Sequence, residues 1–233
     1  MKSFEYRNHT KIIFGEGALG RLADELKFCE KNILLAYGKG AIKRQGIYDE
    51  IIKILADCGK NVTELSGIMP NPTAAKVREG VALCKENDVD FILAVGGGSV
   101  IDCCKAIAVG AVLKEDFWDI LYTKREKAPK ALRIGTVLTM VGTGSEMNGT
   151  AVITNDELKI KASFGSPYVY PMFSILDPTF TYSLPRYQMV SGICDIMSHL
   201  MELYFSGEDD NVSDDLNEAL MKSIAKNARI AVK

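Results

Sequence analysis

A short apolar segment followed directly by three glycines constrains this fold more than any other feature of the sequence. Residues 91–95 (FILAV) are apolar without interruption, and residues 96–99 (GGGS) lead from them into a helical pattern over residues 100–112. A strand that is apolar on both faces is typical of a parallel sheet covered by helices on both sides. The sequence therefore predicts an α/β fold with a close turn at the end of this strand.

The same alternation of strand and helix recurs along the first three-quarters of the chain. Further strands are predicted at residues 33–37, 62–65, 134–138 and 173–176, helices within residues 42–58 and at 74–84, an exposed loop at 123–130, and a hairpin of residues 151–154 with 159–164. From Pro185 onward strand patterns disappear, and residues 186–205 and 213–233 have helical spacing. We therefore expect a Rossmann-like parallel-sheet domain over residues 1–184 and the first helices of an all-helical domain over residues 185–233.

Charge and composition exclude several classes of partner. The 28 Lys and Arg residues against 30 Asp and Glu give a net charge of −2, and the two signs are interspersed. Such a balance does not attract a nucleic-acid backbone or an anionic membrane. The sequence has no apolar run of about 18 residues and no signal-peptide pattern, which predicts a cytoplasmic protein. Its six scattered cysteines form no CxxC pair, so we expect reduced, mostly buried thiols.

The turn at residues 96–99 is a candidate phosphate site. Glycines allow a close backbone approach, and the free amides at a helix N-terminus attract a pyrophosphate. Ser99 is expected to cap the helix and to donate to a phosphate oxygen. The spacing is neither GxGxxG nor a Walker loop, so the ligand could be a dinucleotide or a mononucleotide, and a purely structural turn stays possible.

Gly38 and Lys39 occupy the equivalent place after an earlier predicted strand. Open α/β sheets bind ligands outside the carboxyl ends of their strands. A lysine there favours a ribose phosphate, and hence slightly favours NADPH over NADH, although a solvated surface lysine is an equal alternative.

A second cluster of hydroxyls and glycine lies at the end of the strand over residues 134–138. It contains Thr139, Thr143, Gly144 and Ser145. Short donors at one sheet edge suit the nicotinamide half of a coenzyme; taken alone, the motif is only a turn.

Asp195 and His199 are four residues apart on a predicted helix, so both side chains lie on one face. A carboxylate and an imidazole so placed could chelate Fe(II) or Zn(II). The alternative, an aspartate that orients a histidine, is at least as common, and two ligands are fewer than the three or four of a catalytic site. Cys194, beside Asp195, is expected to pack among apolar residues rather than to act as a nucleophile.

Four ordered motifs carry a resemblance. GGGSVID at 96–102, GTGSEMN at 142–148, LDPTFTYSLP at 176–185 and GICDIMSHLMELY at 192–204 resemble the iron-containing alcohol dehydrogenase family, in its branch of butanol dehydrogenases and aldehyde reductases. The resemblance extends from Phe4 to Lys233. It implies an NAD(P)-binding α/β domain, a helical metal-binding domain, a homodimer, and hydride transfer between NADH or NADPH and a small primary alcohol or aldehyde.

The resemblance also implies the positions of the site residues. Those near the coenzyme would be Gly38, Lys39, Asn71, Gly97, Gly98, Ser99, Asp102, Thr139, Thr143, Ser145, Lys161 and Leu184. Asp195 and His199 match the first two of four metal ligands, and no other catalytic side chain is expected. The family supplies two further histidines beyond these positions, whereas no histidine follows His199 here. We therefore expect weak metal binding and little turnover from these 233 residues.

Two alternatives stay open at this point. Glycerol dehydrogenases and dehydroquinate-type synthases are similar in their architecture and glycine-rich loop. A non-catalytic module that binds NAD(P)H without turnover is the second alternative.

Overall fold

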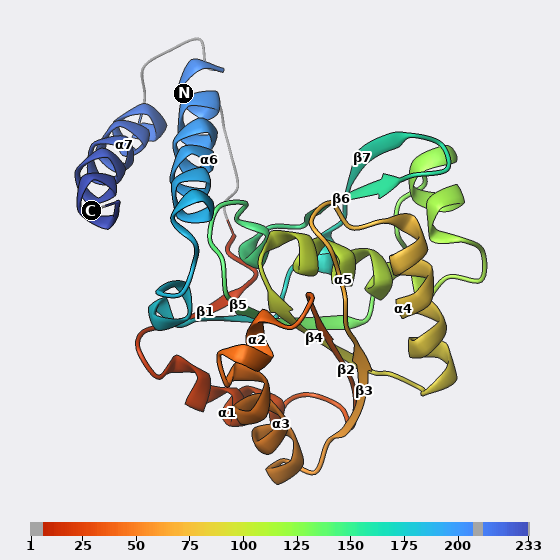
Figure 1. Cartoon of the computed structure of the whole chain (residues 1–233). Helices are drawn as coiled ribbons and strands as arrows, with labels where there is room; N and C mark the ends of the chain where they lie inside the picture. The colour runs from red at the N-terminus through yellow and green to blue at the C-terminus, as the bar shows by residue number, and fades with distance from the viewer. Residues whose placement is uncertain (1–6, 207–211, 233) are drawn as a thin grey trace.

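The chain forms one large parallel sheet with helices on both faces. The computed structural model describes residues 7–206 and 212–232. Its main sheet has six strands in the order β1-β8-β5-β4-β2-β3, and every neighbouring pair is parallel. The strands are β1 (Lys11–Phe14), β2 (Asn32–Tyr37), β3 (Asn61–Leu65), β4 (Phe91–Gly96), β5 (Arg133–Leu138) and β8 (Phe173–Leu176). The expected Rossmann-like α/β class is therefore confirmed (Figure 1).

The first three helices of the chain cover one face of the sheet, and the next two cover the other face. On one face lie α1 (Leu22–Leu26), α2 (Ala41–Arg44) and α3 (Ile47–Asp57); on the other lie α4 (Ala74–Glu86) and α5 (Gly98–Gly110). Alternate residues of the central strands enter the two cores: Leu35 and Leu93 pack with α1 and α3, whereas Leu34 and Ile92 pack with α4 and α5. This double coverage explains why β2 and β4 are apolar throughout.

The strand order reverses between β2 and β4. From β2 the chain crosses outward to the edge strand β3, and from β4 it proceeds in the opposite direction through β5 to β8. The two strands are in register from Ile33 beside Phe91 to Tyr37 beside Val95, so their carboxyl ends lie together. In open α/β sheets such a reversal creates the crevice in which ligands bind.

A separate hairpin packs against α4 and α5. Its antiparallel strands are β6 (Thr150–Asn155) and β7 (Ile160–Gly165), as predicted. The amide of Thr154 donates to the carbonyl of Pro72, which ties the hairpin to the loop before α4. A short π-helix, η2 (Asp119–Thr123), lies beneath β7, and most of the predicted loop that follows it is exposed.

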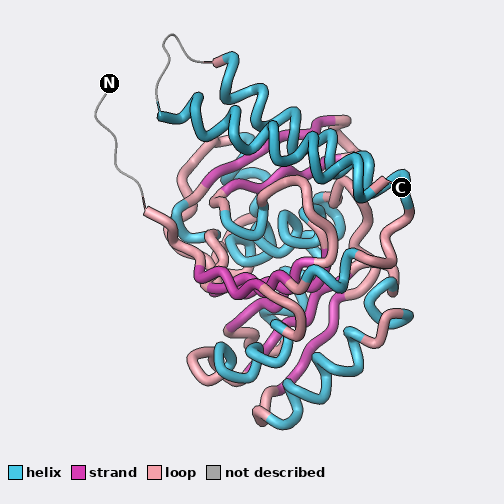
Figure 2. Tube along the Cα trace, turned by 90° about the vertical axis from the view of Figure 1, so that its left-hand side faces the viewer, coloured by secondary structure: helices cyan, strands magenta, loops and turns pink. Residues whose placement is uncertain are grey.

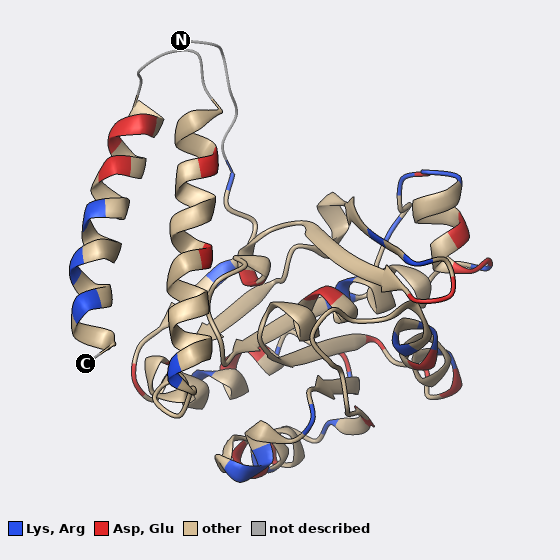
Figure 3. Cartoon of the chain, turned by 45° about the horizontal axis from the view of Figure 1, so that its top comes forward, with Lys and Arg blue, Asp and Glu red and all other residues tan. Residues whose placement is uncertain are grey.

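Two long helices follow the sheet. They are α6 (Arg186–Phe205) and α7 (Val212–Ala231), and they lie side by side as an antiparallel pair (Figures 1 and 2). Acidic residues gather in the first turn of α7 and basic ones nearer its end, an arrangement that favours the helix dipole (Figure 3). The change from strands to helices falls between Leu176 and Arg186. A domain division at residues 184 and 185 agrees with it and stays a prediction.

Three features of the fold differ from the sequence prediction. The edge strand β1 and the short helix α1 were not predicted from the sequence. The single helical region expected within residues 42–58 is two helices, because Gly46 between them has φ of 76°, in the left-handed region.

None of the helices in the described ranges is long and apolar enough to span a membrane.

Candidate functional site

The glycine-rich turn joins β4 directly to α5. Gly96 is the last residue of β4, Gly97 is the N-cap of α5, and Gly98 is its first helical residue. The amides of Val100 and Ile101 donate to the carbonyl of Gly97, which leaves the preceding amides at the helix N-terminus free of intrahelical acceptors. The turn thus presents backbone donors at the carboxyl edge of the sheet.

Close packing, rather than an unusual φ, requires glycine at these positions. A Cβ on Gly97 would lie 3.2 Å from the Cβ of Met140, and one on Gly98 would lie 2.7 Å from the Cγ2 of Thr143. A Cβ on Gly96 would come within 2.8 Å of the Cβ of Val100. The loop after β5 therefore lies directly against the glycine turn.

Ser99 does not cap α5, contrary to the sequence prediction. The N-cap is Gly97, which has no side chain, and Ser99 lies within the first turn of the helix. Because the helix begins at Gly98, two residues earlier than predicted, the Ser99 hydroxyl is not used for capping. It remains a donor at the helix N-terminus, where it lines the adjoining cavity.

A cavity of about 460 Å³ opens beside the turn. Four chain segments line it: residues 68–70 after β3, the glycine turn, the loop over residues 140–143, and the first part of α6. Gly192 allows this approach, because a Cβ there would lie 3.0 Å from the carbonyl oxygen of Val141. The cavity unites five of the predicted site residues, namely Gly97, Gly98, Ser99, Thr143 and Asp195.

Half-buried Asp102 and buried Ser145 form a hydrogen-bonded pair. The Ser145 hydroxyl donates to Oδ1 of Asp102 at 2.6 Å, and the amide of Val152 donates to Oδ2 at 3.0 Å. Burial raises the pKa of Asp102, and these hydrogen bonds oppose the increase. Ser145 is 2% exposed, and its hydroxyl takes part in this network. Its predicted position near the nicotinamide stays a prediction.

Lys105 completes the network and was missed by the sequence analysis. Its side chain is fully buried, and its Nζ donates to the hydroxyl of Ser145 at 2.9 Å. The signal that could have found it is a single lysine, three residues after Asp102, within the otherwise apolar part of α5.

Asn71 and Lys161 are brought together from distant parts of the sequence. The Nζ of Lys161 on β7 donates to Oδ1 of Asn71 at 2.7 Å. Asn71 has φ of 55° in the loop before α4. The pair lies at the carboxyl edge of the sheet but does not line the cavity.

Besides Asn71, Asp102, Ser145 and Lys161, four further predicted coenzyme residues lie outside the cavity lining. Gly38 follows β2, and its carbonyl accepts a hydrogen bond from the amide of Gly67 at 3.1 Å. Lys39 beside it is exposed, Thr139 follows β5, and Leu184 is half-buried just before α6. Their predicted contacts with a coenzyme stay predictions.

Asp195 and His199 share one face of α6, as the spacing predicted. His199 Nε2 lies 3.8 Å from Asp195 Oδ2, and both side chains are about half exposed, at 55% and 46%. The oxygen and nitrogen donors suit one borderline divalent ion. Within residues 7–206 and 212–232, no group of three His, Cys, Asp or Glu residues is placed to hold a metal.

Comparison with known proteins identifies the family. The family model described as iron-containing alcohol dehydrogenase matches residues 9–178, which is most of the chain. The chain belongs to the iron-containing alcohol dehydrogenase family. The resemblance stated from the four motifs is therefore confirmed.

Relatives and solved structures of this family are similar to the chain over nearly its whole length. It is 50% identical over 229 residues to the probable NADH-dependent butanol dehydrogenase 1 of Bacillus subtilis, covering 98% of this chain and 59% of the relative. It is 36% identical to the NADPH-dependent aldehyde reductase YqhD of Escherichia coli, covering 100% of this chain and 60% of the relative. The crystal structure of NADH-dependent butanol dehydrogenase A from Thermotoga maritima superposes with a TM-score of 0.93 at 41% identity, covering 97% of this chain and 57% of that one.

The chain thus spans about three-fifths of the length of the curated relatives it matches. The named relatives are oxidoreductases, and the solved structures support the α/β architecture described above. The activity of a whole enzyme of this kind is therefore a proposal for these residues.

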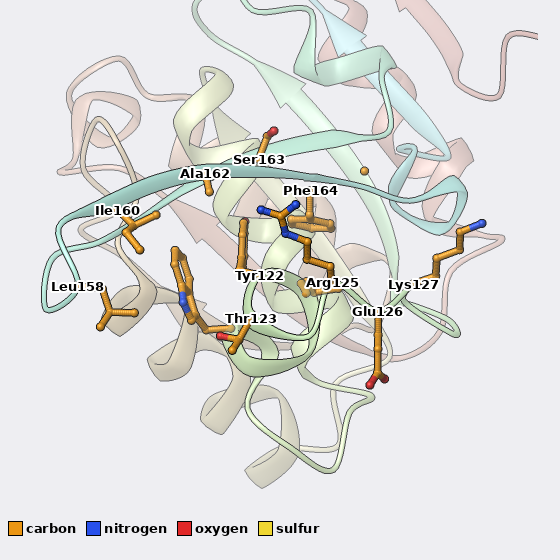
Figure 4. Close-up of a pocket in the computed structure, with 13 residues that line it drawn as sticks. Tyr122, Thr123, Arg125, Glu126, Lys127, Leu158, Ile160, Ala162, Ser163 and Phe164 are labelled. Carbon is orange, nitrogen blue, oxygen red and sulfur yellow. The ribbon is translucent and has the colours of Figure 1, made fainter.

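A second cavity, of about 620 Å³, lies on the other side of the hairpin. Figure 4 shows it between β7 and η2, with the Arg125 side chain extending towards Phe164. Aromatic rings close its floor, and those of Trp118 and Tyr122 stack with centroids 4.2 Å apart. None of the family site residues predicted from the sequence lines it, so it is separate from the candidate coenzyme site.

Cys194 is exposed on α6, so the expectation that it packs among apolar residues is wrong. Four other thiols (Cys29, Cys84, Cys103 and Cys104) are buried, and burial raises the pKa of each. We expect one thiol per chain to react rapidly with a disulfide reagent such as dithionitrobenzoate at neutral pH, and we expect Cys194→Ser to remove that phase. A rapid phase that persists in the variant would contradict the assignment.

Proposed function

We propose that the chain binds NAD(P)H in the 460 Å³ cavity and, as part of an enzyme of the butanol dehydrogenase type, transfers hydride between that coenzyme and a small primary alcohol or aldehyde. The observation that carries the proposal is the glycine turn, whose free amides and absent side chains face the cavity at the point where the strand order reverses. Family membership supports the chemistry, since the named relatives are NADH- or NADPH-dependent dehydrogenases and reductases.

The protein's own part in this proposal is binding and orientation. The amides of Gly98 and Ser99, with the Ser99 hydroxyl, would hold the pyrophosphate, and Thr143 would flank it. When bound, the nicotinamide ring supplies or accepts the hydride. The remaining residues proposed around the coenzyme are Gly38, Lys39, Asn71, Gly97, Asp102, Thr139, Ser145, Lys161 and Leu184.

The choice of coenzyme is a finer part of the proposal. Lys39 is exposed at the end of β2, where a cation favours the additional phosphate of NADPH. The relatives include both NADH- and NADPH-dependent enzymes. Parallel fluorescence titrations with NADH and NADPH, repeated with Lys39→Ala, test the preference: the variant should lose affinity for NADPH and keep its affinity for NADH.

Metal dependence is proposed on Asp195 and His199, which would supply two ligands to Fe(II) or Zn(II). An ion held there would polarise the oxygen of the substrate. A homodimer, which the family resemblance implies, and a cytoplasmic location, which the sequence pattern predicts, complete the proposal.

We expect the 233-residue chain to retain well below one equivalent of iron or zinc after dialysis. Two half-exposed donors hold an ion less tightly than the three or four of a catalytic site. Elemental analysis measures this directly, with His199→Ala as the control for ions bound elsewhere. A near-stoichiometric content that the variant loses would overturn the expectation.

A non-catalytic NAD(P)H-binding module is the second candidate function. It is favoured by the contrast between a complete glycine turn and only two metal donors on α6. Reduction of butanal by NADPH or NADH, measured with and without added Fe(II) or Zn(II), separates the two functions. Turnover supports the dehydrogenase, whereas coenzyme binding without turnover supports the module.

A further inference from the structure

Lys105 is a buried cation that the proposed chemistry does not use. Its side chain is 0% exposed in the middle of α5, seven residues after the helix begins at Gly98. Placing an ammonium in an apolar core costs free energy unless hydrogen bonds compensate. The structure provides that compensation from a single neighbouring segment.

All four acceptors of the Lys105 ammonium belong to residues 145–150. Its Nζ donates to the Ser145 hydroxyl at 2.9 Å, to the carbonyl and Oδ1 of Asn148 at 2.8 and 2.9 Å, and to the carbonyl of Thr150 at 2.8 Å. Asn148 Oδ1 also accepts from the amide and hydroxyl of Thr150, at 3.0 Å each. The ammonium therefore holds η3 (Ser145–Met147) and the start of β6 in one arrangement on α5.

The same segment continues to the glycine turn. The amide of Ser145 donates to Oγ1 of Thr143 at 3.2 Å, and the Thr143 side chain lies where a Cβ of Gly98 would be. Thr143 and Gly98 both line the 460 Å³ cavity. A chain of contacts thus runs from Lys105 through Ser145 and Thr143 to the proposed pyrophosphate site.

We infer that Lys105 is a positioning residue for coenzyme binding: by anchoring residues 145–150 on α5, it holds Thr143 against the glycine turn in the arrangement that accepts the pyrophosphate. The inference rests on the proposed function for the identity of the ligand. It extends that function by assigning part of the coenzyme affinity to a side chain that does not line the cavity.

Burial and the neighbouring charges set the pKa of Lys105, and this pKa decides the pH range in which coenzyme affinity should depend on pH. Burial lowers the pKa of Lys105 to about 8, and Asp102 on the same helix and Glu146 on η3 partly oppose the decrease. The positive charge of Lys161 on β7 lowers the pKa of Asp102. Burial raises the pKa of the Tyr122 phenol on η2, so this group stays neutral in the same pH range. Above pH 8 a growing fraction of Lys105 is neutral, with one donor fewer for its four acceptors.

Coenzyme affinity should therefore fall as the pH rises through the pKa of Lys105. If binding requires the protonated, anchored form, the affinity is constant below about pH 7 and decreases between about pH 8 and about pH 9.5. The NADH phosphates do not titrate in that range. Lys105→Met should give a weak affinity that changes little with pH, and this difference separates positioning from a purely structural role.

The test is a series of NADH fluorescence titrations across this pH range on the full 233-residue chain. We expect Lys105→Met to weaken NADH binding about tenfold at neutral pH and to remove the decrease at alkaline pH. Lys85→Met is the matched control, because Lys85 is an exposed helical lysine whose Nζ donates to one carbonyl, that of Leu113. It should bind as the wild type does. Asn148→Ala, which keeps the ammonium and removes the Oδ1 that accepts from Lys105 and from Thr150, serves if Lys105→Met does not fold.

Hydrogen exchange distinguishes failure of this inference from failure of the proposed function. Amides of residues 143–150 should exchange faster in Lys105→Met than in the wild type, with or without NADH. If the folded wild type does not bind NADH, the coenzyme proposal fails, and unchanged exchange in the variant would overturn the anchoring as well. Wild-type affinity and an unaltered pH profile in a folded Lys105→Met variant would overturn the inference while leaving the coenzyme site intact.

Discussion

Gly98→Val is expected to abolish measurable NAD(P)H binding while leaving the sheet folded. The new Cβ would lie 2.7 Å from Cγ2 of Thr143, so the valine cannot enter without moving the loop over residues 140–143. That movement would separate the loop from the glycine turn, both of which line the 460 Å³ cavity, and would misplace the first amides of α5.

The size of this effect follows from the bonds lost. Hydrogen bonds from backbone amides to a charged phosphate contribute about 1.5 kcal/mol or more each, so losing two of them costs roughly 3 kcal/mol, or about 100-fold in Kd. The added methyl groups exclude the ligand further. Enhancement of NADH fluorescence on mixing measures the loss, and circular dichroism verifies that the variant is folded.

Gly20→Val is the matched control for this substitution. Gly20 is exposed, and a Cβ there meets no atom within 4 Å, so the same change of residue should leave NADH affinity unaltered. Equal affinity in wild type and Gly98→Val would refute the assignment of the pyrophosphate to this turn.

The central strands and the glycine turn could be predicted from the sequence because local pattern determines them. The segment containing Phe91 is apolar on both faces, a property that only a doubly covered parallel strand requires, and β4 begins at that residue. The positions of Asp195 and His199 followed from helical spacing alone, and the structure places them on one face of α6.

Features that depend on tertiary contacts could not be predicted in this way. Strand β1 has only four residues with a mostly exposed pattern, and it forms because β8 offers a free edge to it. Ser145 was predicted only as a ligand-binding hydroxyl, and the structure shows in addition that it donates to Asp102 and accepts from Lys105. Since these partners come from another segment, no spacing within 142–148 indicates them.

Phe91→Ala is the second large effect, and it acts on stability. Phe91 is the first residue of β4, its side chain is 0% exposed, and its ring is stacked on that of Phe173 with centroids 6.0 Å apart. Removing a buried phenylalanine leaves a cavity in the core between the sheet and helices α1 and α3, at a cost of about 3 to 5 kcal/mol in the free energy of unfolding. Urea unfolding measures the cost. Phe28→Ala, at a side chain that is 69% exposed, should change the free energy of unfolding by no more than about 0.5 kcal/mol.

The same unfolding experiment connects the core to the proposed site. Because a ligand that binds only the folded chain stabilises it by an amount set by its concentration and Kd, saturating NADH should raise the unfolding free energies of wild type and Phe91→Ala equally. Gly98→Val should show no such increase. Equal unfolding midpoints for Phe91→Ala and wild type would contradict the packing argument, whereas a smaller NADH effect in Phe91→Ala would show that the core beneath β4 also shapes the glycine turn.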